Sequence, residues 1–162
     1  MEQQGHSHIY DLAEVCARHG IRHAVICPGS RSAPLALAFG NHPEINYRVI
    51  PDERSAAFIA LGMAQAGRRP VILICTSGTA AMNFAPAVAE AFFQEIPLLV
   101  CTADRPPEWV GQRDGQTIFQ TGIYGRHVKG EFNVHVDGNP DRYWIANRMM
   151  NEAIGLACEL PK

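Results

Sequence analysis

The sequence predicts a doubly wound α/β domain, in which helices cover both faces of a mostly parallel β-sheet. Three short runs, at 24–27, 71–76 and 98–102, are almost wholly apolar. Segments whose apolar residues recur at helical spacing lie between these runs. Strands that are apolar on both faces and alternate with helices are typical of a parallel sheet buried between two helical layers. With 162 residues and 47% hydrophobic content, the chain is long enough for one domain with a buried core.

The predicted order begins with a helix, a strand and a second helix. The first helix is expected to end at Gly20, because glycine is the preferred residue at the end of a helix. The first strand, 24–27, follows. The second helix is expected to begin at Ser32, with Pro34 in its first turn, and the turn at 40–43 ends it. The apolar faces of the two helices consist of Ile9, Leu12, Ala13 and Cys16 in the first and Leu35, Ala38 and Phe39 in the second.

The middle of the chain repeats this alternation. Residues 47–50 form a second predicted strand, and a helix follows over about 54–66, with Gly67 as its cap. The next apolar run gives the clearest strand. The turn at 77–79 is then predicted to lead into a helix that runs to about Phe93, with a bend near Pro86, because proline lacks the backbone N–H that a helix interior needs.

The last third of the chain is expected to contain two strands and a helix. The apolar run at 98–102 gives another buried strand, and a loop rich in Pro, Gly and Gln follows over 105–116. Residues 132–136 predict a weaker strand. The final helix has an apolar face that consists of Tyr143, Ala146, Met150, Ala153 and Ala157.

Charge and composition exclude several classes of protein. The formal net charge is −2 and no basic stripe is visible, which argues against nucleic-acid binding. The apolar runs are too short to span a membrane, and the N-terminal residues do not form a signal peptide. The five cysteines are odd in number and lie mostly in apolar segments, as expected for free, buried thiols in the cytoplasm. His6 and His8 could chelate a metal together, but on a frayed terminus they are expected to be solvated, so no metal ligand is predicted.

Four loops are predicted to lie together at one edge of the sheet. Each follows a strand and is rich in Gly, Pro, Ser and charged residues. In a doubly wound sheet, ligands bind at the carboxyl ends of the strands. The loops therefore form one candidate site, made of residues 27–32, 51–55, 76–79 and 103–107.

Position alone leaves the charged residues of these loops ambiguous. Glu53 lies in the first turn of a helix, where the dipole favours an acidic residue by about 0.3–1 kcal/mol, and Asp52 suits the N-cap. Arg31 and Arg105 could form surface ion pairs or bind carboxylates in a bidentate manner. Ser30 lacks the flanking glycines of a nucleophile elbow, and the sequence has no P-loop or dinucleotide-binding motif.

Four motifs together resemble one enzyme family. They are CPGSRSAPLALA from Cys27, PDERSAAFIALGMA from Pro51, CTSGTAAMN from Cys75 and TADRPPE from Thr102. In this order and spacing they are similar to the 2-succinyl-5-enolpyruvyl-6-hydroxy-3-cyclohexene-1-carboxylate synthase family of menaquinone biosynthesis, whose members depend on thiamin diphosphate. The resemblance covers nearly the whole chain. It implies the N-terminal, pyrimidine-binding domain of an enzyme that decarboxylates 2-oxoglutarate and adds the remaining four-carbon unit to isochorismate.

The resemblance also implies roles for individual residues. Glu53 matches the catalytic glutamate, which hydrogen-bonds N1′ of the cofactor's aminopyrimidine, and a desolvated carboxyl suits that proton sharing. Pro28 and Thr79 match positions that border the pyrimidine end of the cofactor. Phe119 departs from the family, whose members often carry arginine there, so the polar contact made from that position is in doubt. The positions that match substrate-facing residues are Ser30, Arg31, Arg105 and Gln116.

The rest of the active site is expected on a different domain. The resemblance implies that the cofactor lies between this domain and the diphosphate-binding domain of a second subunit, in a homo-oligomer such as a dimer or tetramer. The Gly-Asp-Gly motif of that domain, which holds Mg²⁺ or Mn²⁺, does not occur in this sequence. Residues 1–162 alone are therefore expected to bind no cofactor and to be inactive. They are also expected to stop before the last strand, leaving an exposed sheet edge that could pair with a neighbour.

Two other functions stay open. The chain could belong to a different thiamin-diphosphate enzyme, a 2-oxoacid decarboxylase or carboligase. It could also be a non-catalytic α/β module whose loop arginines bind an anionic effector, in which case Glu53 would only stabilise its helix. The joint presence of Glu53 and the Thr-Ser-Gly-Thr loop at 76–79 favours an enzyme, because a simple effector module needs neither.

Overall fold

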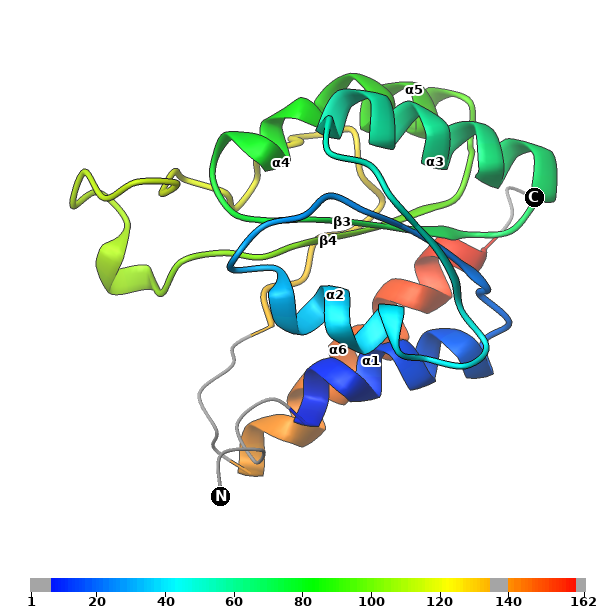
Figure 1. Ribbon diagram of the computed structural model, residues 1–162, viewed down its shortest axis with the longest axis horizontal. Coiled ribbons are helices and arrows are strands. Elements are labelled where there is room, and N and C mark those ends of the chain that lie inside the picture. The colour runs from blue at the N-terminus through cyan, green and yellow to red at the C-terminus, as the bar shows by residue number, and fades with distance from the viewer. Residues whose placement is uncertain (1–6, 135–139, 160–162) are drawn as a thin grey trace.

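The fold is a four-stranded, all-parallel sheet between two helical layers (Figure 1). The computed structural model describes residues 7–134 and 140–159. The strand order is β2-β1-β3-β4, and every neighbouring pair is parallel. The predicted doubly wound α/β class is therefore confirmed. The strands are β1 (His23–Ile26), β2 (Asn46–Val49), β3 (Val71–Cys75) and β4 (Leu98–Thr102).

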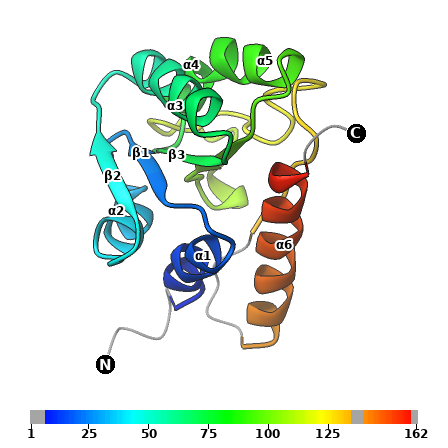
Figure 2. The same ribbon diagram turned by 90° about the vertical axis from the view of Figure 1, so that its right-hand side faces the viewer.

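Each face of the sheet carries its own set of helices, as Figure 2 shows from the side. The first face is covered by α1 (Ser7–Arg18), α2 (Ala33–Gly40) and α6 (Pro140–Cys158). The opposite face is covered by α3 (Glu53–Gly67), α4 (Thr79–Asn83) and α5 (Ala85–Phe93). Both layers are needed because each central strand has apolar side chains on both sides.

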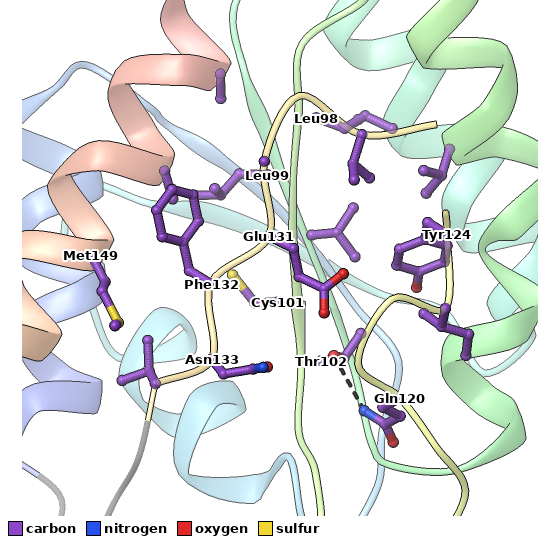
Figure 3. A pocket seen from close by; sticks show the side chains of 18 of the residues that line it. Leu98, Leu99, Cys101, Thr102, Gln120, Tyr124, Glu131, Phe132, Asn133 and Met149 are labelled. Atoms are coloured by element: carbon purple, nitrogen blue, oxygen red, sulfur yellow. Dashed lines mark hydrogen bonds between the residues drawn. The ribbon is translucent and has the colours of Figure 1, made fainter. Parts of the chain in front are cut away.

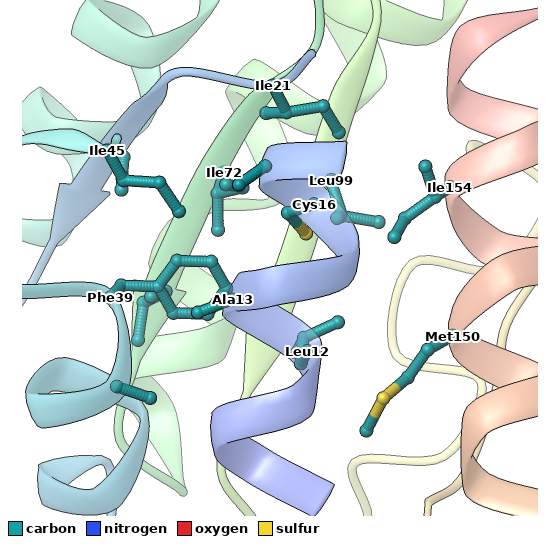
Figure 4. Close-up of a cluster of buried hydrophobic side chains, with 14 of the residues drawn as sticks. Leu12, Ala13, Cys16, Ile21, Phe39, Ile45, Ile72, Leu99, Met150 and Ile154 are labelled. Atoms are coloured by element: carbon teal, nitrogen blue, oxygen red, sulfur yellow. The ribbon is translucent and has the colours of Figure 1, made fainter. Parts of the chain in front are cut away.

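The continuous apolar runs divide between two separate cores. Ile72 and Ile74 of β3 pack with α1, α2 and α6, whereas Val71, Leu73 and Cys75 of the same strand pack with α3, α4 and α5. Successive strand side chains point to opposite faces, so a strand between two helical layers must be apolar at every position. Figure 4 shows the first core, where the side chains of α1 lie between β3, α2 and α6.

Two sequence-based helix boundaries need correction. The single helix expected between the turn at 77–79 and Phe93 is two helices, α4 and α5, that meet at the fully buried Phe84. Pro86 lies in the first turn of α5, where a missing N–H costs nothing, and it therefore starts a new helix instead of bending one. The end of α3 is also different: Gly67 is its last residue, and the left-handed cap is Arg68, with φ 49°.

The strand expected over 132–136 is not formed where the structure describes it, since residues 132–134 have no strand partner. Residues 135 and 136 lie outside the described residues. Accordingly, β4 is paired on one side only, with β3, within the described part of the chain.

A large cavity runs along the unpaired side of β4. Its volume is about 1350 Å³, and Figure 3 shows Leu98, Leu99, Cys101 and Thr102 of β4 in its wall. Side chains of α6, such as Met149, line one side, and Tyr124 lies on the other. The cavity thus lies beside β4 in the layer of the sheet, between the same two helical layers that enclose β3 and β4.

The expectations for thiols, metals and membranes have different outcomes. All five cysteines are free, and Cys16, Cys27 and Cys75 are buried as expected. His8 is not solvated: it is buried in α1 and contacts the ring of Tyr143, while His6 lies outside the described residues. Over residues 7–134 and 140–159 no cluster of potential metal ligands is found. In the same ranges, no helix has the length and apolar character needed to cross a membrane.

Candidate active site

The predicted loops do meet at the carboxyl edge of the sheet. Because β1, β3 and β4 are parallel neighbours, their ends lie side by side (Figure 1). The pairing continues beyond the strands: the Cys27 N–H donates to the Ile74 carbonyl at 2.8 Å, and the Ala103 N–H donates to the Cys75 carbonyl at 3.0 Å. The first residues of three loops are thereby held in register with one another.

Gly29 allows the loop after β1 to approach β3 closely. A Cβ atom at this position would lie only 2.4 Å from the Cβ of Thr76, so no other residue fits without moving one of the loops. The Ser32 hydroxyl donates to the Gly29 carbonyl at 3.1 Å and turns the loop into α2. Pro28 and Ser30 are exposed on this turn, as a ligand contact requires.

Asp52 and Glu53 have separate roles at the start of α3. Asp52 is the N-cap, and its side chain accepts a hydrogen bond from the Ser55 N–H at 2.7 Å. Hydrogen bonding from the Ser55 side chain, and to a smaller degree this backbone bond, lowers the pKa of Asp52. The side chain of Glu53, the first residue of the helix, is half-buried and has no hydrogen bond or ion pair to any described residue. The capping function therefore belongs to Asp52, and the carboxylate of Glu53 is free.

The carboxylate of Glu53 lies toward the ends of β1 and β3. Burial raises the pKa of the Cys27 thiol to about 12, and the nearby charges of Glu53 and Asp52 add to the increase. The pKa of Cys75 is also raised, chiefly by burial and to a smaller degree by Cys27 and Glu53. Cys27 follows β1 and Cys75 ends β3, so the charge of Glu53 lies near the carboxyl ends of both strands.

Gln116 is fixed against two of these loops. Its side-chain oxygen accepts a hydrogen bond from Arg31 at 2.6 Å, and its carbonyl accepts one from the Ser77 hydroxyl at 2.8 Å. A Cβ at Gly78, whose φ is 83°, would lie 2.9 Å from the Gln116 Cα. Gln116 itself has a φ of 58°, a left-handed conformation that is strained for this residue type. Two predicted substrate-facing residues, Arg31 and Gln116, are thus in direct contact.

Arg105 is already paired inside its own loop. Its guanidinium donates to the carboxylate of Asp114 and lies 5.3 Å from the ring centroid of Trp109, which is in the short 3₁₀ helix η2 (Pro107–Trp109). The Nε atom is buried and has no hydrogen-bond partner. The expectation that Arg105 binds a substrate carboxylate stays a prediction, and it would require Asp114 to share or release the guanidinium.

The remaining predicted positions surround these groups. Thr79, the first residue of α4, is exposed beside the buried Gly78. The side chain of Phe119 is 81% exposed, so this apolar residue has no packing role within the described part of the domain. The hydroxyl of Thr76 is buried at the end of β3 without a hydrogen-bond partner.

Sequence reasoning missed Gln120, which joins three segments of the site. Its side chain is buried and bonds to the backbone of Gly78 and of Ala103. No local pattern marks it, because these partners lie 42 and 17 residues away along the chain.

These groups fit the pyrimidine end of a thiamin cofactor. A free, half-buried carboxylate can share a proton with a weakly basic ring nitrogen. Gly29 and Gly78 let the loops after β1 and β3 pack closely against Thr76 and Gln116, which fixes the positions of these loops. The described residues offer no acidic cluster for the metal ion that a diphosphate group needs.

Comparison with known families supports the same interpretation. Residues 10–127 match the family described as thiamine pyrophosphate enzyme, N-terminal TPP binding domain. The chain belongs to this family. The match covers all of the candidate site, from the loop after β1 to the segment that contains Gln116 and Gln120.

Three similar curated proteins carry the name 2-succinyl-5-enolpyruvyl-6-hydroxy-3-cyclohexene-1-carboxylate synthase. The protein from Cytophaga hutchinsonii is 50% identical over 155 residues, which are 95% of this chain and 28% of the relative. The protein from Porphyromonas gingivalis is 47% identical over 96% of this chain and 27% of its own length. The protein from Synechococcus elongatus is 58% identical over 74% of this chain and 21% of its own length. The resemblance seen in the sequence motifs is confirmed, and the chain spans about a quarter of the length of these relatives.

Proposed function

We propose that this domain forms the cofactor-activating half of a thiamin-diphosphate synthase that decarboxylates 2-oxoglutarate and adds the four-carbon product to isochorismate. The observation that carries the proposal is the free carboxylate of Glu53 at the ends of β1 and β3. The family match supports the cofactor, and the names of relatives at 47–58% identity support the reaction. The protein would act in the cytoplasm.

Within this proposal, each residue of the site has a distinct task. Bound thiamin diphosphate would supply the carbanion that attacks the substrate and the electron sink for decarboxylation. Glu53 would hold a proton between its carboxylate and N1′ of the aminopyrimidine. Pro28 and Thr79 would border the pyrimidine ring. The remaining polar groups, which would orient the carboxylates of an acidic substrate pair, are Ser30, Arg31, Arg105 and Gln116.

The second half of the site would come from the diphosphate-binding domain of another subunit. That domain would hold the diphosphate through Mg²⁺ or Mn²⁺, as the resemblance to the family implies. The relatives, which are about four times as long as the matched region, have room for such a domain. The functional protein would then be a homo-oligomer, with each site shared between two chains.

The proposed reaction is tested by substrate specificity. We expect the intact protein, with thiamin diphosphate and Mg²⁺, to consume 2-oxoglutarate and isochorismate together, and to leave pyruvate and benzoylformate largely unchanged. Carbon dioxide release and loss of isochorismate absorbance measure the two halves of the reaction. Turnover of pyruvate or benzoylformate without isochorismate would instead favour the other thiamin-diphosphate decarboxylases. If none of the 2-oxoacids reacts, the effector-binding module becomes the better hypothesis.

The cavity beside β4 supports the expectation of a further strand. A five-residue strand with its side chains occupies about 800 Å³, given a rise of ~3.3 Å per residue, a strand spacing of ~4.8 Å and a sheet spacing of ~10 Å. The cavity of about 1350 Å³ is large enough for it, and its walls are mainly apolar. We infer that a segment from elsewhere in the longer polypeptide pairs with β4 in this cavity and closes the exposed sheet edge.

Amide hydrogen exchange of the intact protein tests this inference. Alternate N–H groups of β4 point away from β3 and into the cavity. If an additional strand is present, all β4 amides exchange as slowly as those of β3, because both edges of the strand are hydrogen-bonded. Rapid exchange at every second residue of β4, with slow exchange throughout β3, would show that the edge stays open.

A further inference from the structure

Gln120 connects three segments of the candidate site through one buried side chain. Its Oε1 atom accepts a hydrogen bond from the Gly78 N–H at 2.8 Å. Its Nε2 atom donates to the Ala103 carbonyl at 2.9 Å and lies 3.4 Å from the Thr102 hydroxyl, the contact drawn in Figure 3. Only 7% of Gln120 is exposed, so water does not replace these partners.

Each segment that Gln120 joins carries a residue assigned to the site. Gly78 precedes Thr79, Ala103 lies two residues before Arg105, and Gln120 itself lies four residues after Gln116. The three segments come from the end of β3, the end of β4 and the loop that follows. Displacing Gln120 would therefore move several site residues together, although it is bonded to none of their side chains.

A carboxamide suits this position because it carries a donor and an acceptor without titrating. It must accept from one backbone N–H and donate to one backbone carbonyl at the same time, from atoms at the end of a long side chain. An ionised glutamate could accept from Gly78 but would place a second oxygen against the Ala103 carbonyl. A methionine of similar length would leave both backbone groups without a partner in a buried position, which is costly.

Glu53 is not hydrogen-bonded to this network in the described part of the domain. It lies on α3, after β2, and it makes no hydrogen bond to the three segments. The resemblance to the family implies that the substrate-facing positions would serve chiefly isochorismate, and the network holds the segments of two of them, Arg105 and Gln116. We propose that Gln120 is a positioning residue that holds the acceptor-substrate side of the site, while leaving the proton-sharing function of Glu53 intact. This inference rests on the proposed function.

The kinetic test uses Gln120→Met and Gln120→Glu in the intact protein, with Gln94→Met as the matched control, because Gln94 is exposed at the end of α5. We expect Gln120→Met to raise the KM for isochorismate about tenfold or more, since displacements of ~1 Å in a site can cost ~100-fold. The KM for 2-oxoglutarate should change by less than about threefold. Equal changes in the two KM values, or none, would contradict the positioning role.

Gln120→Glu adds a pH profile that a general loss of stability would not produce. Burial raises the pKa of a carboxyl group at this position. Below that pKa the protonated group donates to the Ala103 carbonyl and accepts from the Gly78 N–H, as glutamine does. The defect of Gln120→Glu relative to wild type should therefore shrink as the pH falls from about 8 to about 5.5, and the defect of Gln120→Met should not. A constant defect in both variants would overturn the assigned hydrogen bonds.

Amide exchange separates this inference from the proposed function. Peptides covering 77–80 and 103–105 should exchange faster in Gln120→Met than in wild type and in Gln94→Met, whatever reaction the protein catalyses. If wild type does not react with isochorismate, the proposed function fails, and the exchange data still decide the role of Gln120. Unchanged exchange at both peptides would overturn the inference even in an active enzyme.

Discussion

Replacing Glu53 by glutamine in the intact protein is expected to lower kcat for carboligation by roughly 10²–10⁴, equivalent to about 3–5 kcal/mol in the activation barrier. The side chain keeps its size but can no longer share a proton with N1′ of the cofactor. The thermal stability should change little, because the carboxylate of Glu53 makes no hydrogen bond or ion pair to the described residues.

The adjacent carboxylate provides the control for this experiment. Asp52→Asn removes a negative charge from the same turn, but asparagine also accepts the capping hydrogen bond that Asp52 receives from Ser55. We expect its kcat to stay within about threefold of wild type, in contrast to a positioned acid–base group. If Glu53→Gln and Asp52→Asn had the same effect, general electrostatics of the loop would explain the loss, and Glu53 would have only a structural role.

Replacing Gly78 by alanine is expected to have the largest effect on stability. The backbone at Gly78 has φ 83° and ψ −146°, a region that is almost limited to glycine. The added Cβ would also lie 2.9 Å from the Cα and 3.1 Å from the carbonyl oxygen of Gln116, which are backbone atoms and cannot rotate away. Backbone strain and overpacking each cost about 1–3 kcal/mol, so the free energy of unfolding should fall by roughly 2–5 kcal/mol.

Gly62 gives the matched substitution for this comparison. It lies inside α3, and a Cβ there would meet no atom within 4 Å. Gly62→Ala should raise the free energy of unfolding by about 0.5–1 kcal/mol, because alanine favours the helix. Denaturant unfolding of the two variants under the same conditions measures both changes. A stable Gly78→Ala variant would show that the segment around Gln116 is not held against the loop after β3.

The strands and the location of the site follow from the sequence for a clear physical reason. A strand between two helical layers is apolar on both faces, so 24–27, 71–76 and 98–102 are marked by composition alone. Once the strands are parallel, their loops must meet at one edge. The two helix boundaries that differ from the sequence-based expectation depend on finer details. Whether Pro86 bends a helix or begins one depends on how Phe84 is buried. Arg68 occupies a left-handed cap position that usually favours glycine.

The side-chain network of the site could not be predicted in the same way. Gln120 bonds to backbone groups 42 and 17 residues away, and Arg31 bonds to Gln116 across 85 residues. Such contacts have no local signature in a single sequence. The same applies to Asp114, which pairs with Arg105, a cation that the sequence suggests for substrate binding. In contrast, Glu53 could be singled out, because its role depends on the family motif and on its place after a strand.

Exchange of the C2 proton of bound thiamin diphosphate with deuterium is the most direct measure of what Glu53 does. The measurement needs no substrate, so it is independent of isochorismate binding and of the network around Gln120. With the intact protein and saturating cofactor, we expect the exchange rate to fall by roughly 10²–10⁴ in Glu53→Gln and to be unchanged in Asp52→Asn. An exchange rate in Glu53→Gln equal to that of wild type would contradict the proton-sharing role of Glu53.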